Sequence, residues 1–476
     1  MKFTKALLPI FAAWSLIFGA AIGTQAQTLT TLANFTGTNG DEPYYGSVIQ
    51  ASNGNYYGTT YWGGKNSDGV VFEVTPAGKL SVIYNFCSLT NCSDGSHPYS
   101  GLILAGNGDF YGTTKLGGAN GDGTIFKMTL GGKLTTLYSF CAKTNCTDGE
   151  DPDGALVQAS SGNFYGTTYS GGASGDGTVF EITQSGTFKT LYSFCSKTNC
   201  SDGGNPYSGL IQGANGNLYG TTYNFGDYHG GTAFEISTAG KFKALYSFCA
   251  QTNCADGENP FGGLTQGANG NLYGTTNIGG SDGYGTIFEL TTAGVLTILH
   301  TFEDTDGGYP VSAPILASDG NFYGTTWADG VTGNGGTIYQ VTSAGAFTSL
   351  YSFCSSSSCA GEYPEGALGQ TTNGEFIGTT TFGGTGDAGT VYSYSTGLGA
   401  FVQTVPVAAK PGTRVVILGN DLTGATSVTF NGTSATFTVN SASEITVTVP
   451  TGATSGTVEV TTPAGTLKSN PSFQIL

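Results

Sequence analysis

Hydrophobic and polar residues alternate along most of the chain in short runs separated by glycine, asparagine and aspartate. In residues 242–248, for example, Phe, Ala, Tyr and Phe alternate with Lys, Leu and Ser. Alternation with a period of two is typical of a β-strand, whereas a helix would need a sustained period near roughly 3.6 residues. No stretch keeps the helical period, so the pattern predicts an all-β protein.

One sequence unit of about 54 residues recurs seven times. Each unit contains four strand-like runs separated by turn residues. In the fourth unit these runs cover residues 209–212, 217–222, 231–237 and 242–248. The clearest marker of the unit is the string Tyr-Gly-Thr-Thr, whose copies begin at Tyr57, Tyr111, Tyr165, Tyr219, Tyr273 and Tyr323, with a variant at Ile377.

Four short strands in each of seven units predict a seven-bladed β-propeller over residues 27–400. The alternative is an open β-solenoid, whose coils usually have shorter periods. Residues 28–35 match the fourth-strand pattern of residues 135–140. We therefore expect the N-terminal segment to complete the last blade, with residues 400–405 as a competitor for that place.

The ten cysteines form five pairs with one spacing, each pair directly after a fourth-strand phenylalanine. Units one and six lack both members of the pair and have a shorter loop. An even number of cysteines in a secreted chain indicates disulfides. The predicted bridges are Cys87–Cys92, Cys141–Cys146, Cys195–Cys200, Cys249–Cys254 and Cys354–Cys359.

The repeat ends near residue 398, and residues 405–476 contain short runs rich in Val and Thr. Several short strands in such a segment predict a small β-sandwich. The Pro411-Gly412 opening, the Phe430-Asn431-Gly432 hairpin and the stretch at residues 450–460 resemble the IPT/TIG family of Ig-like domains. That resemblance implies a spacer or binding module.

The repeat region also resembles a known family. Residues 269–280 read Asn-Gly-Asn-Leu-Tyr-Gly-Thr-Thr-Asn-Ile-Gly-Gly, and residues 285–290 read Gly-Thr-Ile-Phe-Glu-Leu. These strings are similar to the GloVer tandem repeat, found in secreted or surface proteins of bacteria. The resemblance implies an extracellular location and no particular activity.

Residues 1–26 have the features of a secretory signal peptide: two lysines, an apolar segment and the small-residue site Thr24-Gln25-Ala26. We therefore expect a secreted, extracellular or cell-surface protein with no transmembrane segment after cleavage. The formal net charge of −17 disfavours nucleic acids and anionic membrane surfaces as partners. The aromatic content of 12% argues against disorder.

The sequence predicts no catalytic residue, no metal and no cofactor. His97, His229 and His300 fall at three different places in the unit, so they are not expected to form a copper site or a Ser-His-Asp triad. Many acids recur with the unit, which indicates a structural role. The alternatives are Ca²⁺ at the acidic residues 148–153 and an enzyme that uses acids outside the repeat pattern, namely Glu303, Asp304 or Glu375.

Aromatic residues gather directly after the Tyr-Gly-Thr-Thr strings. Aromatic side chains with a polar tip suit contacts with sugars and protein surfaces. We therefore expect a binding or adhesion protein without enzymatic activity, whose partner is a glycan or a surface protein. Packing between blades, a carbohydrate-active enzyme and a structural surface component are the alternatives. The candidate ligand-binding residues are Tyr61, Trp62, Tyr169, Tyr223 and Trp327.

Overall fold

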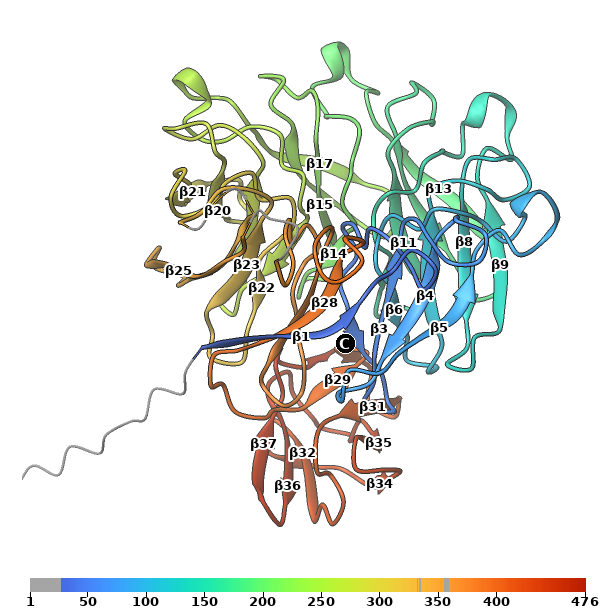
Figure 1. Ribbon diagram of the computed structural model, residues 1–476, viewed down its shortest axis with the longest axis vertical. Coiled ribbons are helices and arrows are strands. Elements are labelled where there is room, and N and C mark those ends of the chain that lie inside the picture. Colours follow the sequence, from blue (N-terminus) through green and yellow to red (C-terminus); the bar gives the residue numbers. More distant parts are fainter. Residues whose placement is uncertain (1–26, 332, 334, 355–358) are drawn as a thin grey trace, which may run out of the picture.

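The computed structural model describes residues 27–331, 333, 335–354 and 359–476 (Figure 1). The predicted signal peptide lies outside these residues. Strands dominate the described chain, and its helical elements are the short 3-10 turns η1 (Thr90–Cys92), η2 (Thr144–Cys146), η3 (Thr198–Cys200) and η4 (Thr252–Cys254). None of the helices in this part is long and apolar enough to cross a membrane.

The repeat units fold into seven antiparallel sheets of four strands each, which confirms the strands expected in every unit. Sheet 1 contains β2 (Ile49–Gln50), β3 (Tyr56–Thr60), β4 (Val70–Val74) and β5 (Leu80–Asn85). Sheet 2 contains β6 (Ile103–Leu104), β7 (Phe110–Thr114), β8 (Thr124–Met128) and β9 (Leu134–Ser139). Sheet 3 contains β10 (Val157–Gln158), β11 (Phe164–Thr168), β12 (Thr178–Ile182) and β13 (Phe188–Ser193). Sheet 4 contains β14 (Ile211–Gln212), β15 (Leu218–Thr222), β16 (Thr232–Ile236) and β17 (Phe242–Ser247).

The remaining sheets have the same order. Sheet 5 contains β18 (Leu264–Gln266), β19 (Leu272–Thr276), β20 (Thr286–Leu290) and β21 (Leu296–Thr301). Sheet 6 contains β22 (Ile315–Leu316), β23 (Phe322–Thr326), β24 (Thr337–Val341) and β25 (Phe347–Ser352). Sheet 7 contains β26 (Gly369–Gln370), β27 (Phe376–Thr380), β28 (Thr390–Ser395) and the N-terminal strand β1 (Thr28–Asn34).

Strand β1 is the outer strand of sheet 7, so the two ends of the repeat region meet in one sheet. It pairs antiparallel with β28 from Thr28 opposite Ser395 to Asn34 opposite Thr390 (Figure 1). The expected competitor, residues 400–405, lies elsewhere, because β29 (Gln403–Val405) pairs with β31 (Arg414–Leu418) of the C-terminal region. The prediction for the N-terminal segment is therefore confirmed.

Buried apolar clusters lie between successive sheets. Tyr57 of sheet 1 and Phe126 of sheet 2 belong to one such cluster, and the same arrangement recurs between each following pair. A further cluster joins Val70 of sheet 1 to Val391 of sheet 7. Each unit thus shares its core with both neighbours, and no single unit could bury its apolar faces alone.

The glycine and the first threonine of the Tyr-Gly-Thr-Thr string have packing roles that the fifth unit shows. A Cβ on Gly274 would lie 2.6 Å from Phe288 Cζ, so only glycine leaves room for this ring. Thr275 Oγ1 donates a hydrogen bond of 3.0 Å to the carbonyl oxygen of Ser312 in the next unit. The string therefore both packs its own sheet and ties it to the neighbouring one.

The C-terminal region forms the expected small β-sandwich. One sheet has the order β29-β31-β35-β34 and the other β33-β32-β36-β37, and β30 pairs with β38. Its buried core runs from Val402 to Phe473. The further strands are β30 (Ala408–Ala409), β32 (Ser427–Phe430), β33 (Thr433–Ser434), β34 (Phe437–Val439), β35 (Glu444–Thr448), β36 (Val458–Thr462), β37 (Gly465–Lys468) and β38 (Gln474–Ile475).

The sandwich rests on the ends of first strands of the repeat sheets and on the short turns that follow these strands. Ser443 Oγ donates to the carbonyl oxygen of Ser52 at 2.7 Å, and Asn470 Nδ2 donates to that of Leu316 at 3.0 Å. Figure 1 shows the C-terminal strands in red at the lower end, with long loops of the middle sheets at the upper end. The long loops therefore lie at the opposite ends of the repeat sheets.

Candidate binding site

The long loops form what we call the loop face: the loops after each second strand and the loops that connect successive sheets. One backbone hydrogen bond joins the two kinds of loop in every unit. The residue after each Tyr-Gly-Thr-Thr string donates its N–H to the residue before each repeat proline, as Tyr169 does to Asp151 at 2.8 Å. The loops therefore present equivalent positions at the same end of each sheet. The donors are Tyr61, Lys115, Tyr169, Tyr223, Asn277, Trp327 and Thr381.

Four of the five predicted site residues occupy this donor position. The Tyr169 and Tyr223 rings lie 4.5 and 5.2 Å from the Tyr207 ring. The Tyr61 ring lies 5.3 Å from that of Tyr44. The Trp327 ring belongs to a separate group of rings, because its ring contacts are with Tyr309 and Tyr363 at 6.1 and 5.9 Å.

Trp62, the fifth predicted residue, lies beside this position rather than in it. Its ring is edge-on to His97 at 4.3 Å and to Tyr61 at 5.1 Å. Trp62 and Trp327 are similarly exposed, at 42% and 40%. The structure therefore places Trp62 at the margin of the Tyr61 group and does not bring it together with Trp327.

Aromatic residues that follow the repeat prolines complete the site, and the sequence analysis missed them. Tyr45 lies 4.8 Å from both Tyr99 and Phe261, and Phe261 lies 4.3 Å from Tyr207. Units one and five are thus in direct contact across the loop face. We call this group the axial aromatic cluster: Tyr44, Tyr45, Tyr61, Tyr99, Tyr169, Tyr207, Tyr223 and Phe261.

A small irregularity in unit one supplies the central ring. Val48 follows its repeat proline by one more position than Leu102 does in unit two, and the added residue is a second tyrosine. Tyr45 contacts rings from units two and five, whereas Tyr44 stays beside Tyr61. Comparison of the proline-to-strand spacings would have singled out this residue.

An ion pair lies within the axial aromatic cluster. Lys115 Nζ lies 2.9 Å from Asp153 Oδ2 and 4.7 Å from the centre of the Tyr99 ring. The Asp153 side chain has no exposed surface, and its Oδ1 has no hydrogen-bond partner among the described residues. Burial raises the pKa of Asp153, although the Lys115 ammonium group opposes the shift.

Glu365, like Asp153, is a buried carboxyl group directly after a repeat proline. It follows the repeat proline of unit seven and is 6% exposed. Its Oε2 has no hydrogen-bond partner in the described part of the chain. Burial, together with the negative charge of Glu42, raises the pKa of Glu365 to about 8. A protonated carboxyl group at neutral pH can donate a hydrogen bond as well as accept one.

Comparison with protein families identifies the family of this chain. Residues 14–200, 142–333, 195–392 and 267–468 match the model of the Gloeobacter/Verrucomicrobia repeat. The chain belongs to this family. The matches together cover most of the chain, and each of them spans several of the repeat sheets. A search of curated proteins found no significant match.

Several solved structures of low sequence identity align with part of this chain. A putative 6-phosphogluconolactonase from Bacteroides uniformis is 13% identical, with a TM-score of 0.42 over 64% of this chain and 83% of its own. The periplasmic gluconolactonase of Pseudomonas aeruginosa is 14% identical, with a TM-score of 0.41 over 68% and 95%. The PQQ-bound aldose sugar dehydrogenase of Streptomyces coelicolor is 11% identical, with a TM-score of 0.40 over 78% and 98%.

The acids that recur in the Gloeobacter/Verrucomicrobia repeats hold the loops in shape. Asp148 is fully buried and accepts hydrogen bonds from Tyr138 Oη at 2.6 Å and from the N–H groups of Ala142 and Lys143 at 2.9 and 3.1 Å. The acids of the third strands accept from tyrosine in the same way, as Glu289 does from Tyr273 at 2.8 Å. These acids accept hydrogen bonds within the fold and have the structural role that their recurrence indicated.

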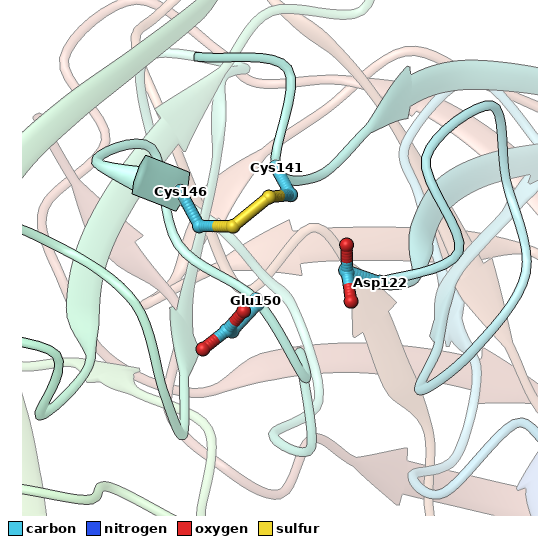
Figure 2. A group of neighbouring side chains, drawn as sticks. All are labelled: Asp122, Cys141, Cys146 and Glu150. Atoms are coloured by element: carbon cyan, nitrogen blue, oxygen red, sulfur yellow. A yellow bond between two sulfur atoms is a disulfide. The ribbon is translucent and has the colours of Figure 1, made fainter. Parts of the chain in front are cut away.

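The disulfides are confirmed in all five predicted pairs. Figure 2 shows Asp122 and Glu150 beside the Cys141–Cys146 bridge, the largest group of potential metal ligands among the described residues. Metals bind cysteine as the thiolate, and both sulfur atoms here are bonded to each other. This group therefore offers two carboxylates and no thiolate ligand.

Some of the acids considered as alternatives are engaged within the fold, and others lie at opposite ends of the sheets. Within residues 148–153, Asp148 accepts hydrogen bonds from its own loop and Asp153 pairs with Lys115, so these two carboxylates are already engaged within the fold. Glu303 lies exposed in the loop after β21 on the loop face, whereas Glu375 lies in the turn between β26 and β27 at the opposite end. Glu303 and Glu375 are therefore too far apart to flank one glycosidic bond together.

Proposed function

We propose that the protein is an extracytoplasmic binding or adhesion protein without enzymatic activity, and that the axial aromatic cluster binds carbohydrate. The seven sheets then act as the blades of a closed β-propeller, with β1 as its clasp. The observation that carries the proposal is the convergence of aromatic rings from separate units, including Tyr45 and Phe261, on one face of the fold.

Carbohydrate is the ligand class that suits this composition. Aromatic rings cover the apolar faces of sugars, and tyrosine hydroxyl and carboxyl groups exchange hydrogen bonds with sugar hydroxyls. The ammonium group of Lys115 lies among the rings of the cluster. Asp153 already neutralises its charge, since Lys115 Nζ lies 2.9 Å from Asp153 Oδ2. A strongly anionic ligand would therefore meet little free positive charge.

The location and the C-terminal region fit the same proposal. Five disulfides indicate an oxidising compartment, extracellular or periplasmic, and the expected signal peptide would deliver the chain there. The C-terminal sandwich, which resembles an IPT/TIG domain, contacts the turns opposite the loop face. It would then act as a spacer that leaves the aromatic cluster free.

The first experiment is a glycan and polysaccharide array with the mature protein, followed by titration of the strongest ligand. Tyr223→Ala removes a ring of the cluster, and we expect its Kd to rise about tenfold, which corresponds to about 1.4 kcal/mol. Val295→Ala is the matched control, since Val295 is exposed in a turn at the opposite end. Trp62→Ala should have a smaller effect than Tyr223→Ala because Trp62 lies at the margin.

Absence of binding across the array, or equal affinities of Tyr223→Ala and the unaltered protein, would contradict the proposal. The search would then turn to protein partners or to a structural role at the cell surface.

A carbohydrate-active enzyme is the second candidate, because the raised pKa of Glu365 is a property of general acids. Hydrolysis of a polysaccharide panel that is lost in Glu365→Gln would favour this candidate. A panel without turnover would exclude it.

A further inference from the structure

The fourth unit contains a cavity that no residue of the axial aromatic cluster lines. It lies on the loop face between the loop before sheet 4 and the loop that joins β15 to β16, and its volume is about 480 Å³. This volume is in the range of small-ligand sites, roughly 300–1,000 Å³. The lining residues are Thr198, Asn199, Cys200, Ser201, Phe225, Gly226, Asp227 and His229.

Two lining residues have a backbone conformation that disfavours side chains. Phe225 and His229 both have a φ of 65°, in the left-handed region where a bulky residue is strained. At the Phe225 position five other units have glycine, also with positive φ: Gly63, Gly117, Gly171, Gly279 and Gly383. Strained residues persist where the surrounding fold imposes them and gather at functional sites.

A second change accompanies Phe225. The residue facing this loop is Gly204, and a Cβ there would lie 2.8 Å from Phe225 Cδ2. The five units with glycine in the Phe225 position have a polar side chain in the facing position: Asp41, Ser96, Glu150, Glu258 and Glu362. Unit four has thus exchanged a polar side chain for an aromatic one, with glycine making the space.

We propose that this cavity binds one sugar residue of a glycan, as a second contact beside the axial aromatic cluster. The inference rests on the proposed carbohydrate-binding function. Phe225 offers a ring to the apolar face of the sugar, and Asp227, Asn199 and His229 offer hydrogen-bond donors and acceptors to its hydroxyl groups. None of the described lining residues is lysine or arginine, so phosphate and other anions lack a charged partner.

The test measures affinity and thermal stability together. Cellohexaose, xylohexaose, mannohexaose, laminarihexaose and chitohexaose are titrated into the mature protein by calorimetry, and the tightest is used with the variants. Phe225→Ala should raise its Kd about tenfold, the effect of losing about 1.4 kcal/mol. His229→Gly should also weaken binding while raising the Tm, because glycine tolerates this backbone conformation.

The matched control is Ser67→Gly, at the position of unit one that corresponds to His229. Ser67 also has a positive φ, of 62°, and is exposed outside the cavity. It should raise the Tm and leave the Kd unchanged. Unchanged affinity in both Phe225→Ala and His229→Gly would overturn the inference.

The outcomes of these experiments distinguish the axial aromatic cluster from the unit-four cavity. If Tyr223→Ala weakens binding and Phe225→Ala does not, the axial proposal stands and the unit-four cavity is excluded. If only Phe225→Ala weakens binding, the cavity is supported and the axial cluster is not the sugar site. If none of the five hexasaccharides binds the unaltered protein, this inference is overturned, and the array decides the proposed function separately.

Discussion

Two carboxyl groups interrupt the aromatic residues that follow the repeat prolines. Asp153 and Glu365 occupy the position that Tyr99, Tyr207 and Phe261 hold in other units. Lys115 compensates the burial of Asp153, whereas Glu365 Oε2 has no such partner among the described residues. A buried carboxyl group without a cationic partner destabilises the fold when it is ionised, and such groups are typical of functional sites.

The stability of the protein should therefore depend on pH through Glu365. Its pKa is about 8 in the fold, against 4.5 for an ordinary glutamate. The unfolded chain releases this proton first as the pH rises, so the free energy of unfolding falls between about pH 4.5 and pH 8. We expect the free energy of unfolding of the Glu365→Gln variant to fall less over this range. At pH 8 the variant should be more stable than the unaltered protein by roughly 3 kcal/mol.

Denaturant unfolding of both proteins at pH 5 and pH 8 measures this difference. Asp153 is present in both, so its own contribution cancels in the comparison. The same loss of stability in both proteins between pH 5 and pH 8 would show that Glu365 ionises normally.

At the scale of elements, an aspartate accepts backbone hydrogen bonds in five of the loops that connect successive sheets, and one of these five loops has no disulfide. Asp148 accepts hydrogen bonds from two backbone N–H groups of the loop that contains Cys141 and Cys146. The loop after sheet 5 has no cysteines, and there Asp306 accepts from the Glu303 N–H at 2.8 Å and contacts His300 Nε2 at 2.8 Å. The aspartate is thus present with and without the bridge.

We expect the aspartate to matter more for stability than the bridge beside it. Closing so short a loop contributes about 2 kcal/mol in the chain-entropy description, which is the expected loss in the double variant Cys141→Ser/Cys146→Ser. Asp148→Ala removes three hydrogen bonds to a charged acceptor and should lose roughly 3 kcal/mol or more. Guanidinium unfolding of both variants measures the two losses, and a larger loss from the cysteine variant would contradict this ranking.

At the scale of the whole molecule, the repeat sheets form one continuous body and the C-terminal sandwich is an addition to it. Apolar clusters connect each sheet with the next and sheet 7 with sheet 1. The sandwich has its own core and meets the repeats through contacts such as Ser443 with Ser52. The clusters between the sheets bury apolar area. A contact such as that of Ser443 with Ser52 adds a single hydrogen bond, whose net contribution to stability is small.

Two truncations should therefore behave differently. Removal of residues 399–476 should leave the Tm of the repeat region within a few degrees of its original value. Removal of residues 27–34 takes away β1, leaves β28 paired only with β27 and opens the cluster between sheets 7 and 1. It should lower the Tm by about 10 °C or more. Scanning calorimetry of both proteins tests this, and an unchanged Tm without β1 would show that its pairing with β28 contributes nothing to stability.

The sequence by itself determined the features that depend on local pattern. The period of two defined the strands, and the recurrence of Tyr-Gly-Thr-Thr defined the sheets, because each string performs the same packing task in its own unit. The match of residues 28–35 to a fourth strand predicted β1, since every other unit already had four runs. The spacing of each cysteine pair predicted its bridge, because the partners are five positions apart.

Only the tertiary structure decided which side chains meet at the loop face. Trp62 and Trp327 look alike in the sequence, yet they lie in different groups: Trp62 lies beside Tyr61, and Trp327 lies beside Tyr309 and Tyr363. Tyr45 and Phe261 come from units one and five, and their contact depends on how seven sheets pack around one another. Local patterns specify each sheet, but contacts between distant units depend on the accumulated rotation from sheet to sheet, which no local pattern contains.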